Sequence, residues 1–310
     1  MTEYNSFIGV DVSRHHLDIH ILSTGHQERI ANSFEAASAL MARHPGAAFA
    51  CEATGGYERA LLHAAHACGQ AIWRLHPADV HAFGRLVGQR AKSDPIDACK
   101  IARACACVAE TRKPTHVRPH SDAVRDLVML RSHCLDMITL WRGHLTRLSG
   151  AARRIATRQL QHALRMKAEL TAQIAAAIAA EDTLEEQAKR LTSLPGVGPI
   201  TAAVLIADMP KLGTLSARQA AALAGVAPHP RQSGSRQKTG RCSGGRSRLR
   251  RTLYMAALAA IRAQKDPFAG CYKHLRENGK PHKIAITAVM RKMIVALNQI
   301  TKEKRNWKPA

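Results

Sequence analysis

The stretch SFIGVDVSRHHLDIHIL, residues 6–22, indicates the fold most directly. Its first half is short, apolar and β-branched around Asp11, and its second half, from His16 to Leu22, alternates polar and apolar side chains. Runs of this length and period are typical of β-strands. We therefore predict two paired strands, with Asp18 on the outward, polar side of the second strand.

Strands and helices alternate after this pair. Glycines and prolines interrupt the apolar runs at short intervals, which is typical of an α/β domain. The predicted strands are 27–32, 47–53 (AAFACEA) and 71–75, and the predicted helices are 57–68, 77–87 and 95–109. This order of elements fits an RNase H-like α/β domain over residues 1–115.

The remainder of the chain is predicted to be mostly α-helical. Residues 121–190 contain no proline, and Leu, Ile and Met recur there at three- and four-residue intervals, which favours long helices. An antiparallel hairpin or coiled coil that spaces two domains or mediates oligomerisation is the simplest interpretation. We predict a helical spacer over 116–190 and a mostly helical C-terminal domain over 191–310.

The charge of the chain indicates its partner. Lys and Arg total 46 against 23 acidic residues, a formal net charge of +23, and residues 209–265 contain no Asp or Glu. Such a surface attracts nucleic acid, although a merely basic soluble protein is the alternative. The eight cysteines form no paired CxxC motifs, and no apolar run reaches the length of a membrane span. We expect reduced thiols, a cytoplasmic location near the nucleoid, and no membrane.

Four carboxylates suggest metal chemistry. Asp11 lies inside an apolar strand, Glu52 ends a buried strand, and Asp94 and Asp97 begin a helix on one of its faces. Separately each has an ordinary explanation, such as a turn former or a helix cap. Together they could converge at one sheet edge and bind Mg²⁺, which prefers hard oxygen ligands.

Two further motifs suggest phosphate contacts. In LPGVGP, Gly196 and Gly198 resemble the hairpin of helix-hairpin-helix modules, where backbone amides approach a phosphate. The segment 228–251 surrounds four serines with cations and has no acid, which suits a phosphate-binding loop, although a flexible basic loop with solubilising serines is the simpler explanation from these residues alone. Its cations are Arg231, Arg236, Lys238, Arg241, Arg246, Arg248, Arg250 and Arg251.

Taken in order, FIGVDV, CEATGGY, KSDPIDA, LPGVGPITA, PHPRQSG and LRRTLYMAA resemble the DEDD transposases of insertion sequences, the family that includes the pilin-gene invertases. The resemblance implies a RuvC-like N-terminal domain with magnesium at Asp11, Glu52, Asp94 and Asp97. It also implies a C-terminal transposase domain in which Ser233 attacks DNA and forms a covalent 5′-phosphoserine.

The same resemblance implies partners. Family members act as tetramers, as dimers of dimers, with a structured bridge RNA that pairs with donor and target DNA. Two alternatives stay open at this point. One is a RuvC-like nuclease or junction resolvase in which water attacks, and the other is a non-catalytic DNA- or RNA-binding protein.

Overall fold

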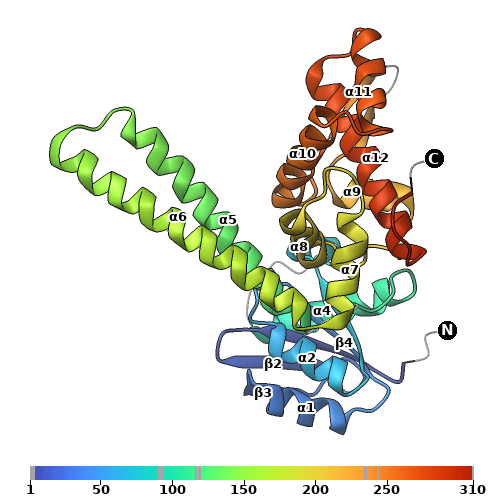
Figure 1. Ribbon diagram of the computed structural model, residues 1–310. Helices are drawn as coiled ribbons and strands as arrows, with labels where there is room; N and C mark the ends of the chain where they lie inside the picture. The colour runs from blue at the N-terminus through green and yellow to red at the C-terminus, as the bar shows by residue number, and fades with distance from the viewer. Residues whose placement is uncertain are drawn as a thin grey trace. The chain divides into compact units, whose positions relative to one another are not determined.

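The computed structural model describes residues 4–88, 94–115, 117, 120–233, 236–242 and 244–308. The chain divides into two compact units, Met1–Pro119 and His120–Ala310, each with a hydrophobic core of its own (Figure 1). The sequence-based boundary near residue 115 lies close to this division. The further division of the second unit into a spacer and a transposase domain stays a proposal.

The first unit is built on a five-stranded sheet. Its strands are β1 (Phe7–Val12), β2 (His16–Ile21), β3 (Gln27–Ala31), β4 (Ala48–Glu52) and β5 (Ala71–Leu75). They lie in the order β3-β2-β1-β4-β5, with β1 to β3 antiparallel and β4 and β5 parallel to β1. An antiparallel meander continued by parallel strands is the RNase H-like topology, so the predicted fold is confirmed.

Helices cover both faces of this sheet. The helices are α1 (Phe34–Arg43), α2 (Arg59–Ala67), α3 (Pro77–Leu86) and α4 (Asp94–Ala109). Apolar residues of α1 and α2 pack on one face, and those of α3 and α4 pack on the other. The sequence analysis assigned no element to α1, although Ser33 caps it by accepting a hydrogen bond from the Ala36 backbone N–H.

The second unit is mostly helical, as predicted. Its helices are α5 (His120–Leu145), α6 (Gly150–Ala179), α7 (Asp182–Thr192), α8 (Pro199–Asp208), α9 (Ala217–Leu223), α10 (Ser247–Arg262), α11 (Phe268–Glu277) and α12 (His282–Lys302). Residues of α5, α7, α8, α9, α10 and α12 share one core. By length and composition α12 could cross a membrane, but its Val289, Met293 and Leu297 are buried in this core.

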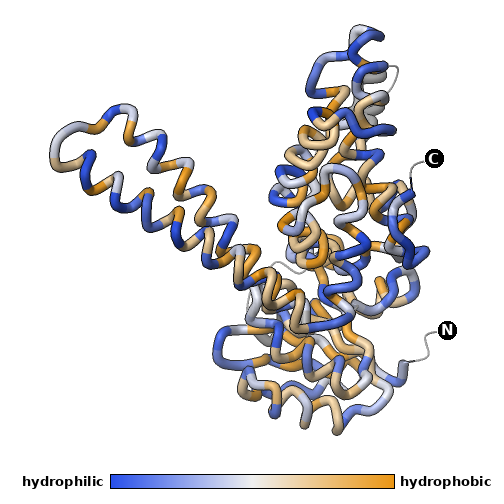
Figure 2. The backbone as a smooth tube through the Cα atoms, in the orientation of Figure 1, coloured by the Kyte–Doolittle hydropathy of each residue, from blue (hydrophilic) through white to orange (hydrophobic). Residues whose placement is uncertain are grey.

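Helices α5 and α6 form the predicted hairpin, an extended antiparallel pair with alternating hydrophilic and hydrophobic segments (Figures 1 and 2). Along α6 the buried residues Ala156, Ala163 and Leu170 recur every seven positions. A seven-residue apolar repeat keeps one narrow seam against the partner helix, which is the pattern of a coiled coil. The small alanines allow the two helices to approach closely.

The segment predicted to be a basic loop is instead a two-stranded hairpin. It consists of β6 (Pro228–Ser233) and β7 (Arg236–Cys242), which pair antiparallel. The register shifts between His229 and Arg231, so the hairpin contains an irregularity near its base. Alternating polar residues with no large apolar side chains concealed this strand pair in the sequence.

Candidate active site

The two strand carboxylates lie beside each other on the sheet. Parallel pairing of β1 with β4 aligns Val10 with Cys51, so Asp11 and Glu52 follow at the next position of each strand. Side chains alternate along a strand, and Phe7 and Ala48 belong to the face covered by α3 and α4. Asp11 and Glu52 therefore share that face, at neighbouring ends of two parallel strands.

Helix α4 crosses the same face close to β1. A Cβ on Gly9 would lie 2.1 Å from the Ala98 carbonyl oxygen and 2.4 Å from the Ala102 backbone nitrogen, so only glycine permits this approach. Asp97 directly precedes Ala98 on α4, and Asp11 lies two residues beyond Gly9 on β1, so both acids belong to the two segments that meet at this contact. Two acids that are 86 positions apart in the sequence are thus carried on a helix and a strand that pack directly against each other.

Asp97 is engaged with a cation of its own helix. The Lys100 Nζ atom lies 2.8 Å from Asp97 Oδ1, and the Lys100 side chain is almost entirely buried. Asp94 begins the same helix, but its side chain lies outside the part of the chain that the structure describes. Lys100 therefore supplies positive charge beside Asp97.

A divalent metal is consistent with these donors only in part. Within the described residues no three His, Cys, Asp or Glu side chains are grouped closely enough to hold a metal ion. Asp11 and Glu52 nevertheless provide hard oxygen ligands on one face, which is the ligand type that Mg²⁺ requires. The pair fits a metal, whereas the full four-carboxylate set predicted from the sequence is not seen among the described side chains.

Asp18 was predicted to face outward, and this prediction is wrong. Asp18 lies directly opposite Asp11 across the β1–β2 pair and is only 7% exposed. The polar side of β2 is the face that α4 packs against. The alternation of polar and apolar residues along β2 therefore did not indicate which side of the strand is exposed to solvent. Arg29 compensates the carboxylate, with Nε 2.7 Å from Asp18 Oδ1.

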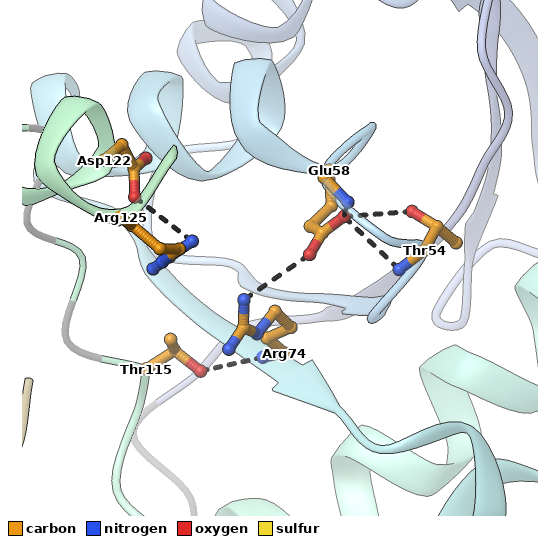
Figure 3. A network of polar contacts seen from close by, with 7 residues as sticks. Thr54, Glu58, Arg74, Thr115, Asp122 and Arg125 are labelled. Carbon is orange, nitrogen blue, oxygen red and sulfur yellow. Dashed lines mark hydrogen bonds and ion pairs between the residues drawn. The ribbon is translucent and has the colours of Figure 1, made fainter. Parts of the chain in front are cut away.

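A further buried carboxylate, Glu58, organises the loop after β4 (Figure 3). Its Oε2 atom accepts hydrogen bonds from the Gly56 N–H at 2.8 Å and from the Thr54 hydroxyl at 3.1 Å and N–H at 3.3 Å. Its Oε1 atom lies 3.4 Å from Nη1 of Arg74 on β5. The loop that follows Glu52 is thus tied to the neighbouring strand, a role that the sequence analysis did not identify.

The pKa of Glu58 reflects these contacts. Burial, the largest influence, would raise the pKa of the carboxyl group, because it disfavours the charged form. Hydrogen bonds from backbone N–H groups and Thr54, together with the charge of Arg74, outweigh it and hold the pKa below the ordinary value. Glu58 is therefore an ionised, fully partnered carboxylate, and its signal in the sequence was the position six residues after Glu52 in CEATGGYE.

Ser233 is the last residue of β6. In the hairpin register it pairs with Arg236, the first residue of β7. The two strands also carry Arg231, Lys238 and Arg241, and neither contains an acid. The side chains of residues 229–241 lie outside the described part of the structure, so their predicted phosphate contacts stay predictions.

A tight glycine contact closes the base of this hairpin. A Cβ on Gly225 would lie 2.6 Å from the Gly244 carbonyl oxygen, and a Cβ on Gly245 would lie 2.4 Å from the Gly225 backbone nitrogen. All three glycines have positive φ angles near 70°. Arg250 Nη1 donates to the carbonyl oxygens of Gly244 at 3.0 Å and Gly225 at 3.4 Å. We call this arrangement the neck of the hairpin.

Several residues predicted to contact phosphate also have partners within the protein. Arg248 pairs with Asp208 through two of its nitrogens, and Arg250 holds the neck. Arg251 forms an exposed ion pair with Asp136, 2.9 Å from Nη1 to Oδ1. Arg248 and Arg250 are thus committed to the fold, whereas Arg251 is on the surface; Arg246 is also exposed.

The two glycines of LPGVGP differ in their surroundings. A Cβ on Gly196, whose φ is +85°, would lie 2.3 Å from the Ala256 carbonyl oxygen of α10. Its missing side chain is thus explained by helix packing. Gly198 has open space around its Cα and precedes Pro199 at the start of α8. Only Gly198 retains the open approach that a phosphate contact needs.

Comparison with known proteins places these features in a family context. The model of DEDD transposases of IS110 type matches residues 8–157, and the model of the transposase IS116/IS110/IS902 family matches residues 188–273. The pilin gene-inverting proteins of Moraxella bovis and Moraxella lacunata are 28% and 27% identical over 260 residues, which cover 82% of this chain and 80% of each relative.

Two shorter matches accompany these. The insertion element IS116 uncharacterized 44.8 kDa protein of Streptomyces clavuligerus is 33% identical over 130 residues, covering 41% of this chain and 32% of that protein. The solved structure of T. thermophilus RuvC in complex with Holliday junction substrate aligns with 35% of this chain and 98% of its own, at 20% identity and a TM-score of 0.30.

Proposed function

Because the chain belongs to the IS110/IS116 family of DEDD transposases, which cut and join DNA, we propose that Ser233 is the nucleophile of the cutting step. The observation that carries this proposal is the place of Ser233 at the end of β6 in a basic hairpin whose base is closed by the neck. The cations carried by the two strands beside this serine favour a polyanionic substrate such as DNA.

In the proposed reaction each phosphodiester bond that breaks is replaced by another phosphodiester bond, so no external energy source is needed. The Ser233 Oγ atom attacks a DNA phosphorus, the bond to the 3′-oxygen breaks, and that oxygen takes up a proton as the serine hydroxyl loses one. A 5′-phosphoserine and a free 3′-hydroxyl result. Joining reverses the exchange, since a 3′-hydroxyl from the other DNA strand attacks the phosphoserine and the serine leaves as a hydroxyl.

Asp11, Glu52, Asp94 and Asp97 are the residues that we propose for magnesium. A bound Mg²⁺ would polarise the phosphate and stabilise the charge that develops on its oxygens. Asp11 and Glu52 supply their oxygens from neighbouring strands, and α4 holds Asp97 over the same face. Asp97 is paired with Lys100, so its participation requires that this ion pair opens or that the lysine stays as a second cation.

Partners follow from the same family assignment. We propose donor and target DNA, a structured bridge RNA that pairs with both, and a tetramer formed as a dimer of dimers, acting at the nucleoid. The net charge of +23 supports nucleic acid as the partner but does not distinguish RNA from DNA. The 116–190 helices would then serve as a spacer between the RuvC-like domain and a transposase domain over 191–310.

The alternative is a nuclease or resolvase in which water attacks at the carboxylate site and Ser233 is uninvolved. The two mechanisms differ in whether a protein–DNA bond ever forms. Denaturing the wild-type reaction midway should leave DNA attached to the protein, and mass spectrometry should place the nucleotide on Ser233.

The variant Ser233→Ala should lose both the adduct and recombination while retaining DNA binding, because the surrounding cations remain. Ser235→Ala and Ser247→Ala are the matched controls and should still form the adduct. Cleavage without any adduct in wild type, or an adduct that persists in Ser233→Ala, would show that the serine assignment is wrong.

A further inference from the structure

The second unit contains a cavity of about 830 Å³ that the hairpin and the carboxylate site leave unused. It is lined by residues of α5, α8, α10 and α12. Its interior is apolar, and cavities of this size are the usual sites of small-molecule-sized ligands. The apolar lining residues are Val128, Leu135, Ile200, Val204, Met255, Ile286 and Met290.

Cations line the same cavity, and none of the described residues that line it is acidic. The lining cations are Arg131, Arg248, Arg250, Arg251 and Lys283. Asp208 and Asp136, which lie outside the lining, neutralise Arg248 and Arg251. Arg131 instead donates from Nε to the Thr171 hydroxyl at 2.9 Å, and Arg250 donates to carbonyl oxygens. Arg131 and Arg250 thus keep a net positive charge beside an apolar interior.

An aromatic side chain is held in place at the cavity. Tyr254 lines it from α10, and its hydroxyl lies 3.3 Å from Nε2 of His282. The other ring nitrogen of His282, Nδ1, lies 2.7 Å from the hydroxyl of Tyr272. Because both ring nitrogens of the histidine are engaged, the orientation of Tyr254 is set before any ligand arrives.

We propose that this cavity binds one unpaired nucleotide of the DNA or RNA partner, with the base inside and its phosphates at the cationic rim. A flat apolar body joined to an anion is the chemistry that the lining complements, and bases stack readily on tyrosine. No acidic residue lines the cavity among the described residues, so nothing there repels the phosphates of a nucleic-acid strand. This inference rests on nucleic acid being the partner, but not on the serine chemistry.

Met255 offers a test that spares the core, since its side chain lines the cavity and is 61% exposed. Met255→Glu places a negative charge where the nucleotide would lie, and Met255→Gln is the neutral control of similar size. Ile155→Glu on α6, a position 51% exposed, makes the same change in net charge elsewhere in the unit. It therefore corrects for the general loss of positive charge.

The probes are fluorescent single strands of one sequence, as DNA and as RNA, each compared with an abasic strand of equal length. All proteins carry Ser233→Ala, so that binding is measured without cleavage and a failure of the serine assignment leaves the result intact. The protein with native Met255 should bind the strand with bases about tenfold more tightly than the abasic strand, the effect of stacking one base. The probe type with this preference identifies DNA or RNA as the source.

Met255→Glu should abolish that preference, while Met255→Gln and Ile155→Glu keep it. A photo-crosslink from 5-iodouracil in the strand should map to the peptide that contains Tyr254. Equal affinity for strands with and without bases would overturn the proposal. So would a Met255→Glu variant that binds strands normally but changes its oligomeric mass, because the cavity would then accommodate a protein partner.

Discussion

Gly225 and Gly245 meet backbone to backbone at the neck of the hairpin that carries Ser233, so closely that neither can accept a Cβ without displacing the other segment. The contact joins the end of α9 to the start of α10, and the hairpin is the stretch of chain between them. The strand that ends at Ser233 is thus anchored by a packing contact eight residues before this serine and twelve residues after it.

The neck predicts a difference between neighbouring glycines. Gly244 and Gly245 have nearly the same φ, +70° and +69°, but a Cβ on Gly244 meets nothing within 4 Å. Gly244→Ala should cost only the strain of a left-handed residue, about 1 kcal/mol of unfolding free energy. Gly245→Ala adds a backbone clash and should lose more stability together with the serine adduct. Urea unfolding measures the stability of each variant, and the yield of the covalent adduct measures its activity. Equal stability and equal adduct yield in the two variants would show that the backbone contact at the neck is not important.

The Asp208–Arg248 pair predicts a large loss of stability rather than of phosphate affinity. Asp208 is buried, so Arg248→Gln leaves a buried carboxylate without its cation, which costs roughly 3–5 kcal/mol. The double variant Asp208→Asn with Arg248→Gln should recover much of that loss. Arg251→Gln is the control, because its ion pair with Asp136 is exposed and contributes little. The measurement is chemical denaturation of each variant.

Salt dependence tests the charge of the hairpin. Replacing Arg231, Arg236, Lys238 and Arg241 together by Gln should reduce the slope of log affinity against log salt by roughly two to four units, since each duplex phosphate contact contributes about 0.9. Fluorescence anisotropy over a salt series gives the slope. An unchanged slope would mean that these cations do not contact DNA phosphates.

The lowered pKa of Glu58 predicts that the protein loses stability as the pH falls into the acid range. Its folded-state pKa lies below the ordinary 4.5, so its contribution is present above 4.5 and is lost as the pH falls through the lowered folded value. Glu58→Gln should be less stable than wild type near neutral pH, and the difference should shrink on acidification. Urea unfolding between about pH 3 and 7 measures it. A difference that stays constant across this range would rule out ionised Glu58 as the cause.

Magnesium should stabilise the first unit through Asp11 and Glu52. In wild type we expect the melting temperature to rise with Mg²⁺, and in Asp11→Asn or Glu52→Gln this rise should disappear while the metal-free protein stays folded. Asp18→Asn is the contrasting variant. It should lower the melting temperature through loss of the Arg29 contact but keep the response to Mg²⁺. If Mg²⁺ raised the melting temperature of Asp11→Asn as much as that of wild type, Asp11 would not be a metal ligand.

The sequence by itself determined the positions of the five strands along the first unit and the long helical hairpin, and it singled out the candidate carboxylates. The length and period of an apolar run reflect which face of a helix or strand must be buried, and both can be read within one short stretch of sequence. The period of β2 also marked Asp18 as polar, but a local pattern does not reveal that α4 covers the polar face of that strand.

Only the tertiary structure decided which charged groups are committed to the fold. Arg248 and Arg250 look identical to their neighbours in RSRLRR, and only the positions of Asp208 and the neck glycines distinguish them. Gly196 likewise serves packing because α10 lies against it. An ion pair or a close backbone contact depends on distances between segments far apart in the chain, and residue spacing along one segment carries no information about those distances.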